Sequence, residues 1–291
     1  MTVGIFRHGA GKQGFALDAI AEGLRKIGVK ATVFHQATRH KFETVVMWTV
    51  PSKKADPRYP IMEAAKENES VVVCVENGYV RRDKYHSIGI GGINGRADFR
   101  NEASPRTRWK KLGVTLAKTW KANKDGHVLI CGQCANDRSL EGTDNAKWCR
   151  EIAQKIPERH KIIYRPHPLR PSDVYFDGRE VMVDSRPKIE HALKGAKMVA
   201  TFSSNSAVDA LIAGVPVYVE SEHSVAHQMS IHLHGGSVPP REIVKQWAYG
   251  LAYTQWNIEE MKEGLPWLHL FGAQRFSGGE SSGLQGVETP T

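Results

Sequence analysis

Residues 198–219 read MVATFSSNSAVDALIAGVPVYV, and this stretch contains one complete unit of the fold. The apolar, β-branched run 198–202 predicts a strand, and 207–213 predicts a short helix that ends at Gly214. The next apolar run, 216–219, predicts a second strand. A strand, a helix and a strand in succession are typical of parallel sheets whose faces are covered by helices.

The same alternation runs along most of the chain. Amphipathic segments at 16–27 and 146–156 predict helices between further strands, which we expect at 2–6, 31–34, 44–48, 70–75, 127–131, 161–164 and 181–183. We therefore predict an α/β protein with two Rossmann-like parallel-sheet domains joined by right-handed crossovers. The expected divisions are an N-terminal domain 1–120, a second domain 121–240, a helical segment 241–275 and a flexible Gly/Ser-rich tail 276–291.

Composition excludes several classes of protein. The 291 residues are 41% hydrophobic and include seven tryptophans, which argues against a disordered chain. No apolar run reaches the roughly 18–20 residues of a membrane-spanning helix, and the first 12 residues lack the features of a signal peptide. Four cysteines are few, and the C-x-x-C of Cys131 and Cys134 has no second pair to complete a zinc site. We expect a reduced, cytoplasmic protein (host cytoplasm if it is phage-encoded) with no metal site.

Positive charge is concentrated in the first half. The chain has 40 Lys and Arg against 31 Asp and Glu, a net charge of +9. Residues 1–125 hold 23 basic and 12 acidic side chains, or +11, and the remainder holds 17 and 19, or −2. This asymmetry indicates a polyanionic partner for the first half, such as nucleic acid, an anionic membrane surface or an acidic glycan. A solubilising surface is the less favoured alternative.

A glycine-rich turn, GAGKQG at 9–14, follows the first predicted strand and opens a helix. This context is typical of a phosphate-binding turn. A dinucleotide site would also need an acidic residue about 20 positions later, and 33–36 read VFHQ, so an acceptor-binding turn is favoured over NAD binding. His8 is a candidate general base, and the expected acceptor contacts here are Arg7, Gly9, Gly11 and Lys12.

Polar groups also follow the fourth predicted strand. Glu76 comes directly after it, where a catalytic general base is expected, although Asn77 and Gly78 read equally well as a simple turn. A glycine-rich loop, GIGGING at 89–95, could approach a ligand closely. The acceptor contacts expected from this region are Asn77, Tyr79 and Asn94.

In the second half, three further strand ends carry polar side chains. Arg165 and His167 alternate with Pro166 and Pro168 after strand 161–164, where arginine can pair with phosphate and histidine can donate or act as an acid. Four small polar residues (Ser203, Ser204, Asn205 and Ser206) precede a helix, where backbone N–H groups attract anions. Glu220 and Glu222 could accept hydrogen bonds from sugar hydroxyls.

The segment 96–124 holds nine basic residues, with Trp109 and Trp120 between them. Basic side chains can follow a phosphate backbone while aromatic rings stack on bases, although such tryptophans are more often buried in a helix face. The predicted acceptor-binding cations of this segment are Arg96, Arg100, Arg106, Arg108, Lys110 and Lys111.

Taken together, these motifs resemble the capsule polysaccharide synthesis family, which includes Kdo transferases of the two-domain GT-B type. The matching pieces are ENGYVRRD at 76–83, GING at 92–95, Gly132 and Gln133, DRS at 137–139, YRPHP at 164–168, SSNS at 203–206, ALIAGVPV at 210–217 and LAYTQW at 251–256. They follow the family order across most of 70–265. The family's usual proline is replaced by Arg82.

The resemblance implies a GT-B-like fold and a UDP- or CMP-sugar donor held by the second domain, with Gln133, Asp137 and Ser139 added to its donor contacts. A nucleotide would leave the anomeric carbon as an acceptor hydroxyl attacks, with Glu76 or His8 as the base and His167 at the departing phosphate. No metal is strictly required for this chemistry.

The acceptor is left open between two hydroxyl compounds. The basic first half favours a hydroxymethylated pyrimidine in DNA, as in phage DNA modification, because no amphipathic membrane helix is evident. The family resemblance instead implies a cell-envelope or capsule glycan or glycolipid. A protein that binds nucleotides or nucleic acid without catalysis is the alternative outside the enzymes.

Overall fold

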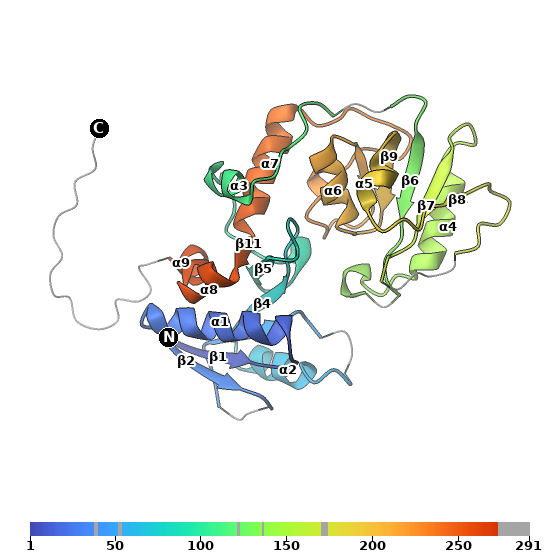
Figure 1. Ribbon diagram of the computed structural model, residues 1–291. Coiled ribbons are helices and arrows are strands. Elements are labelled where there is room, and N and C mark those ends of the chain that lie inside the picture. Colours follow the sequence, from blue (N-terminus) through green and yellow to red (C-terminus); the bar gives the residue numbers. More distant parts are fainter. Residues whose placement is uncertain (38–39, 52–53, 121–122, 136, 170–173, 273–291) are drawn as a thin grey trace, which may run out of the picture.

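The computed structural model describes residues 1–272 apart from 38–39, 52–53, 121–122, 136 and 170–173. These residues form two α/β lobes, each built around one sheet (Figure 1). The predicted flexible tail 276–291 lies outside the described residues. The α/β fold with two Rossmann-like domains is confirmed.

The first sheet has the strand order β11-β5-β4-β3-β1-β2. Its parallel part consists of β1 (Thr2–Phe6), β2 (Lys30–Phe34), β3 (Thr44–Trp48) and β4 (Val71–Asn77). Its other edge is antiparallel and consists of β5 (Tyr85–Ile90) and β11 (Gln255–Asn257). This edge differs from the predicted all-parallel sheet.

A tight turn explains the antiparallel edge. Asn77 ends β4, and the chain reverses at Gly78 into β5. The amide of Gln255, which is completely buried, accepts hydrogen bonds from the backbone N–H groups of Tyr79 and Val80 at 2.8 and 3.0 Å and donates one to the Val80 carbonyl. A side chain near the C-terminal end of the chain therefore satisfies the backbone of this turn, which no local pattern predicts.

Helices cover both faces of the first sheet. On one face, α1 (Lys12–Lys26) packs with α8 (Ile258–Lys262) and α9 (Leu265–Phe271). On the other, α2 (Tyr59–Glu67) packs over Phe42 and Met47. The segment predicted as a separate helical unit, 241–275, thus contributes β11, α8 and α9 to the first lobe.

Close approach of α1 and α8 depends on Gly23. A Cβ atom at this position would lie 1.9 Å from the Met261 carbonyl oxygen and 2.7 Å from the Gly264 nitrogen. Glycine to alanine inside a helix normally stabilises by about 1 kcal/mol. Here we expect Gly23→Ala to destabilise instead, by roughly 1–3 kcal/mol, because backbone must move to make room.

Urea unfolding would measure this effect. Gly14→Ala in the same helix is the control, because its Cβ would meet only the Arg7 guanidinium, which can move away. Equal stabilisation by both substitutions would contradict the packing argument.

The second sheet is parallel, with the order β10-β9-β6-β7-β8. Its strands are β6 (His127–Cys131), β7 (Ile162–Arg165), β8 (Met182–Val183), β9 (Ala196–Thr201) and β10 (Val217–Val219). One face packs on α4 (Asn145–Lys155), and the other packs on α5 (Ile189–Leu193) and α6 (Ser206–Ala213). Three short 3₁₀ helices lie at η1 (Asn94–Arg96), η2 (Arg138–Leu140) and η3 (His227–Met229).

Two helices occur in the sequence where the chain passes from one sheet to the other. These are α3 (Thr107–Leu112) and α7 (Arg241–Tyr253), which pack on each other. Their apolar side chains join the same core as α5, α6 and β9. No helix within the described part of the chain combines the length and apolar character that crossing a membrane requires.

Candidate functional site

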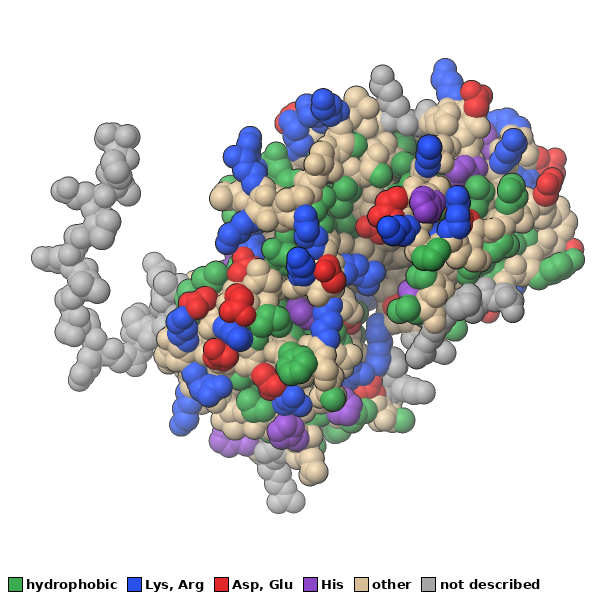
Figure 2. Space-filling view, in the orientation of Figure 1, with side chains coloured by type: hydrophobic (Ala, Val, Ile, Leu, Met, Phe, Trp, Pro, Cys, Tyr) green, Lys and Arg blue, Asp and Glu red, His purple; other side chains and the backbone are tan. Residues whose placement is uncertain are grey.

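A cleft lies between the lobes, at the carboxyl ends of parallel strands from both sheets (Figure 2). Its volume is about 310 Å³. The lining residues are Glu76, Asn77, Gly78, Tyr79, Arg82, Ile93, Asn94, Gln133, Asp137, Arg138, Ser139, His167, Ser203, Ser204 and Asn205. Open α/β sheets bind ligands at this end of their strands, so this cleft is the candidate active site.

The first lobe contributes a carboxylate at the end of β4. Glu76 is half-buried, and its Oε1 accepts hydrogen bonds from the backbone and side-chain nitrogens of Asn77 at 2.8 and 3.0 Å. Asn77 Oδ1 in turn accepts a bond from Lys12 Nζ at 3.2 Å, and the same ammonium bonds the Arg82 carbonyl. Glu76 is thereby held in one orientation, and its Oε2 is available to take a proton from a bound hydroxyl.

Arg82, in the turn between β4 and β5, is an exposed cation of this wall. Among the described residues it forms no ion pair, unlike Arg96 and Arg138. Its charge reaches across the cleft, because it helps to lower the pKa of His167. An unneutralised guanidinium in a cleft is a strong site for phosphate or carboxylate.

In the second lobe, Gln133 braces the strand-end loops. Its Nε2 donates to Ser139 Oγ at 2.8 Å and to Ser203 Oγ at 3.1 Å, and its Oε1 accepts from the Ser203 N–H at 2.9 Å. Gln133 and Ser203 are both buried. These two residues therefore shape the cleft by fixing its loops relative to one another.

The N-terminus of α6 forms part of the same wall. The Asn205 side chain does not cap this helix, Ser204 Oγ accepts from the Ser206 N–H at 3.2 Å, and Ser204 and Asn205 line the cleft in front of it. Asn205 Nδ2 donates across the cleft to the Tyr79 carbonyl at 3.0 Å. The positive end of the helix dipole thus faces the space that Arg82 borders, and both favour an anion.

His167, two residues beyond the end of β7, is half-buried in the cleft wall. Burial lowers its pKa, Arg82 lowers it further, and Asp137 opposes them. The ring is therefore predominantly neutral near pH 7, where it can donate one hydrogen bond and accept another.

Further contacts join the lobes across the cleft. Arg138 Nη2 lies 2.6 Å from Asp56 Oδ2, and Arg58 also pairs with Asp56 at 2.7 Å. Hydrogen bonds from these arginines, that of Arg58 first, hold the pKa of the buried Asp56 well below its usual range. Arg96 pairs with Glu141 at 3.2 Å. These two ion pairs, Arg138 with Asp56 and Arg96 with Glu141, therefore contribute to holding the lobes together.

Asp209, in the first turns of α6, is a candidate source of pH-dependent stability. Burial raises the pKa of its carboxyl to about 6, with Arg82 lowering it and Glu190 raising it. Because the unfolded pKa is about 3.9, ionising the folded carboxyl above pH 6 costs stability, and this cost vanishes below about pH 4. We expect Asp209→Asn to raise Tm by a few °C at pH 8 and not at pH 4.

Thermal unfolding from pH 4 to 8 would test this expectation. Asp125→Asn, at an exposed carboxyl, is the matched control. A gain for Asp209→Asn that is the same at pH 4 and pH 8 would contradict a titration origin.

Comparisons with known proteins bear on this geometry. A scan against protein-family models finds no match, and a search of curated proteins finds no significant relative. Among solved structures, the chain is similar to Thermosulfurimonas dismutans KpsC, beta Kdo 2,4 transferase, with 15% identity over 91% of this chain and 98% of that one, and a TM-score of 0.58. The beta Kdo 2,7 transferase of the same organism's KpsC gives 13% identity, 91% and 99% coverage, and a TM-score of 0.54.

The fold is that of these Kdo transferases. The predicted resemblance to the two-domain GT-B type is thus confirmed at the level of the fold. At this identity the comparison defines architecture, and the chemistry is argued from the residues of the cleft.

Within this Kdo-transferase fold, eleven of the predicted site residues share one cleft. They are Glu76, Asn77, Tyr79, Asn94, Gln133, Asp137, Ser139, His167, Ser203, Ser204 and Asn205. The sequence analysis did not single out Arg138, and it noted Arg82 only as a departure from the family pattern. A signal for both was present, because each lies within a family-like motif (76–83 and 137–139).

Several predicted donor contacts do not fit their role. The buried Arg165 donates to the carbonyls of Arg186 and Pro187 at 2.6 and 2.9 Å, and it does not line the cleft. Glu220 Oε2 accepts from Tyr218 at 2.7 Å and Trp148 at 3.3 Å. Ser206 lies buried in the first turn of α6, and Glu222 is exposed beside His223. These side chains support the lobe around the cleft.

The residues of the glycine-rich turn also lie outside the lining. Arg7 pairs with Asp18 at 2.8 Å, and His8 is exposed and stacks on Phe6. Gly9 and Gly11 adopt positive φ angles in the turn before α1. Of this group Lys12 alone reaches the cleft wall, through Asn77. Between the two predicted bases, the geometry favours Glu76 over His8.

The predicted basic track is largely neutralised. Arg100 pairs with Asp98 at 3.0 Å, and Arg96 is paired across the cleft as described above. Lys111 lies 3.6 Å from Glu260, whereas Arg106 and Lys110 are exposed and form no ion pair among the described residues. Trp109 and Trp120 are buried in the core, so they cannot stack on bases.

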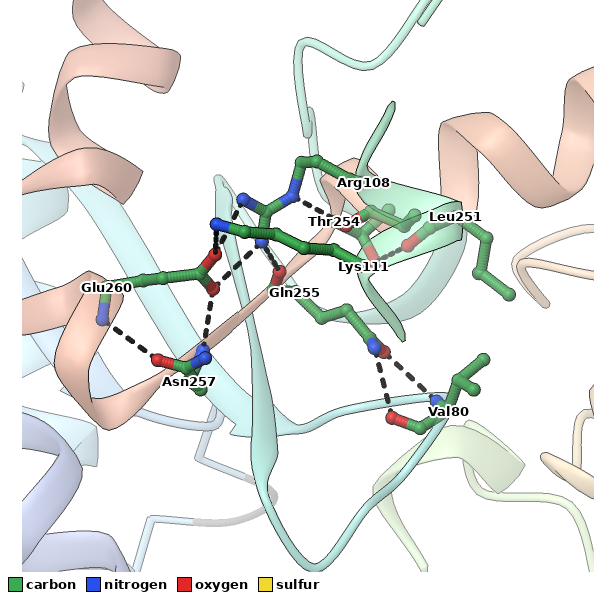
Figure 3. Close-up of polar contacts among 9 residues, drawn as sticks. Val80, Arg108, Lys111, Leu251, Thr254, Gln255, Asn257 and Glu260 are labelled. Carbon is green, nitrogen blue, oxygen red and sulfur yellow. Dashed lines mark hydrogen bonds and ion pairs between the residues drawn. The ribbon is translucent and has the colours of Figure 1, made fainter. Parts of the chain in front are cut away.

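Arg108 is the clearest correction within this track. Its Nη1 and Nη2 bond both carboxylate oxygens of Glu260 at 3.0 Å, and Nη2 and Nε also donate to the Gln255 and Ala252 carbonyls at 2.8 and 3.1 Å (Figure 3). The guanidinium lies 3.8 Å from the centre of the Trp256 ring. Arg108 therefore holds α3 against the C-terminal segment and is not available to an acceptor.

Proposed function

We propose that this protein is a glycosyltransferase that moves a sugar from a nucleotide-sugar donor to an acceptor hydroxyl within the interdomain cleft. The observation that carries this proposal is that the cleft has the Glu76 carboxylate on one wall and the neutral His167 and the α6 N-terminus on the other. Arg82, which forms no ion pair among the described residues, lies beside them. The shared fold with Kdo transferases supports this proposal.

The roles of these groups follow from where charge develops. The acceptor oxygen forms a bond to the anomeric carbon and loses its proton to Glu76, while the bond from that carbon to the nucleotide phosphate breaks. Negative charge grows on the departing phosphate, where Arg82, the His167 ring N–H and the α6 N-terminus can stabilise it. Ser204 and Asn205 lie beside this position.

A glycan hydroxyl is our preferred acceptor. The neighbours in fold are named as Kdo transferases, and the cleft is lined by side chains suited to sugar hydroxyls, such as Asn77 and Asn94. DNA, which the net charge favoured, has less support because Arg108 is mostly covered and paired with Glu260, and Arg96 and Arg100 are already paired. The exposed Arg106 and Lys110 are what remains of the proposed track.

A transfer assay would test the proposal. The protein would be incubated with CMP-Kdo and a panel of UDP- and CMP-sugars, together with a Kdo-terminated oligosaccharide or hydroxymethylated DNA, and products would be weighed by mass spectrometry. We expect a sugar-sized mass gain on the oligosaccharide that Glu76→Gln abolishes and Glu63→Gln, at an exposed carboxylate of α2, leaves unchanged. A mass gain on DNA alone would refute the proposal of a glycan acceptor. If none of the donors were consumed, the proposal that this protein is a glycosyltransferase would be refuted.

A further inference from the structure

A thiol contacts the cleft histidine. Cys134 Sγ lies 3.1 Å from His167 Nδ1, and both side chains are half-buried. Cys134 follows β6 and His167 follows β7, so two neighbouring strand ends bring them together. In the sequence, Cys134 forms a C-x-x-C with Cys131, but Cys131 is buried in the strand and neither cysteine is in a disulfide.

A second contact defines which ring nitrogen carries the proton. The backbone N–H of Leu169 donates to His167 Nδ1 at 3.3 Å. A nitrogen that accepts a hydrogen bond from a backbone amide cannot carry a proton of its own along that direction. The Cys134 thiol, 3.1 Å away, then faces the same lone pair of Nδ1 as a second donor, and the ring proton of neutral His167 lies on Nε2.

We propose that Cys134 is a positioning residue that, with the Leu169 amide, holds His167 in its Nε2–H form with that N–H available to the cleft. This inference rests on the proposed transferase function for its catalytic consequence. The second nitrogen of a histidine commonly fixes the role of the first in this way. His167 then acts as a donor to the departing phosphate, and Cys134 fixes the orientation of its ring, whose pKa burial lowers first and Arg82 to a lesser extent.

The Cys134 thiol can be modified selectively, because the other three cysteines are buried. Burial raises the pKa of Cys74 to about 12, of Cys131 to about 11 and of Cys149 to about 12, so these three thiols are unreactive near neutral pH. A small alkylating reagent such as iodoacetamide should therefore modify Cys134 first. We expect CMP or UMP in the cleft to slow this modification.

Two measurements test the proposal in different ways. Long-range ¹H–¹⁵N NMR of the wild-type protein without substrate reports the tautomer of His167 directly, whether or not the protein is a transferase. We expect the Nε2–H form, with its signals shifted in Cys134→Ala and restored in Cys134→Ser, whose hydroxyl can donate to Nδ1. An Nδ1–H form in the wild type would overturn the proposal.

The kinetic test is a double-mutant cycle on transfer. We expect Cys134→Ala to lower kcat about tenfold with little change in KM, Cys134→Ser to recover most of that loss, and Cys134→Ala with His167→Ala to be no worse than His167→Ala alone. Independent, multiplying losses would overturn the positioning role. A wild type that shows the Nε2–H form and transfers no sugar would instead refute the transferase function and leave the positioning intact.

Discussion

Arg82→Gln is expected to lower kcat for sugar transfer by about 100- to 1,000-fold, the usual cost of removing one charged or hydrogen-bonding group at a developing negative charge. Arg82 is the cleft cation that forms no ion pair among the described residues, so its full charge is available to a phosphate. KM for the donor should rise less than kcat falls, because the phosphate charge is greatest in the transition state.

Steady-state kinetics with the active donor would measure this loss. Arg106→Gln is the matched control, because Arg106 is exposed and lies outside the cleft lining. Increasing the salt concentration should weaken donor binding in the wild type more than in Arg82→Gln. If Arg82→Gln kept the wild-type kcat, Arg82 would not stabilise the charge of the departing phosphate.

Arg108→Met is expected to destabilise the fold by about 3–5 kcal/mol, because it leaves the Glu260 carboxylate buried without its bidentate partner. Lys111, 3.6 Å from Glu260, is mostly exposed and compensates only in part. The substitution also removes the guanidinium from the face of Trp256. A fall in Tm of roughly 10 °C should follow.

Urea and thermal unfolding would quantify this effect. The double variant Arg108→Met with Glu260→Met should be clearly more stable than Arg108→Met alone, since no charge is then left buried. If Arg108 were an acceptor-binding residue with little structural role, Arg108→Met would unfold like the wild type and lose only activity.

Local patterns predicted the parallel strands well, because each is a buried apolar run between turns. Thr2–Phe6, Thr44–Trp48 and His127–Cys131 are found at the predicted limits. The strands β5 and β11 were not predicted. Tyr85–Ile90 contains Ser87 and Gly89 in an otherwise short run, and Gln255–Asn257 is two polar residues around one tryptophan. β11 depends on pairing with β5, which is distant in sequence, whereas β5 pairs with the preceding strand β4 and with β11.

The site residues that could be predicted from sequence are polar side chains at or just after the carboxyl ends of strands. Topology brings the carboxyl ends of parallel strands to one edge, which gathered Glu76, His167 and Ser204 into one cleft. The roles of the cations were harder to predict from sequence, because an arginine can either contact a ligand or donate hydrogen bonds to backbone carbonyls. The buried Arg165 does the second, whereas Arg82 faces the cleft, and only the three-dimensional surroundings distinguish them.

The return of β11 to the first sheet has a consequence for how the protein is made. During synthesis the strands β1 to β5 of the first lobe emerge from the ribosome before the second sheet, but Gln255, which satisfies the turn after β4, and α8, which covers α1, emerge after it. The five strands of the second sheet therefore emerge while the edge strand β5 of the first sheet is still without its partner β11. Premature termination between the lobes would leave an exposed strand edge open to pairing with other chains.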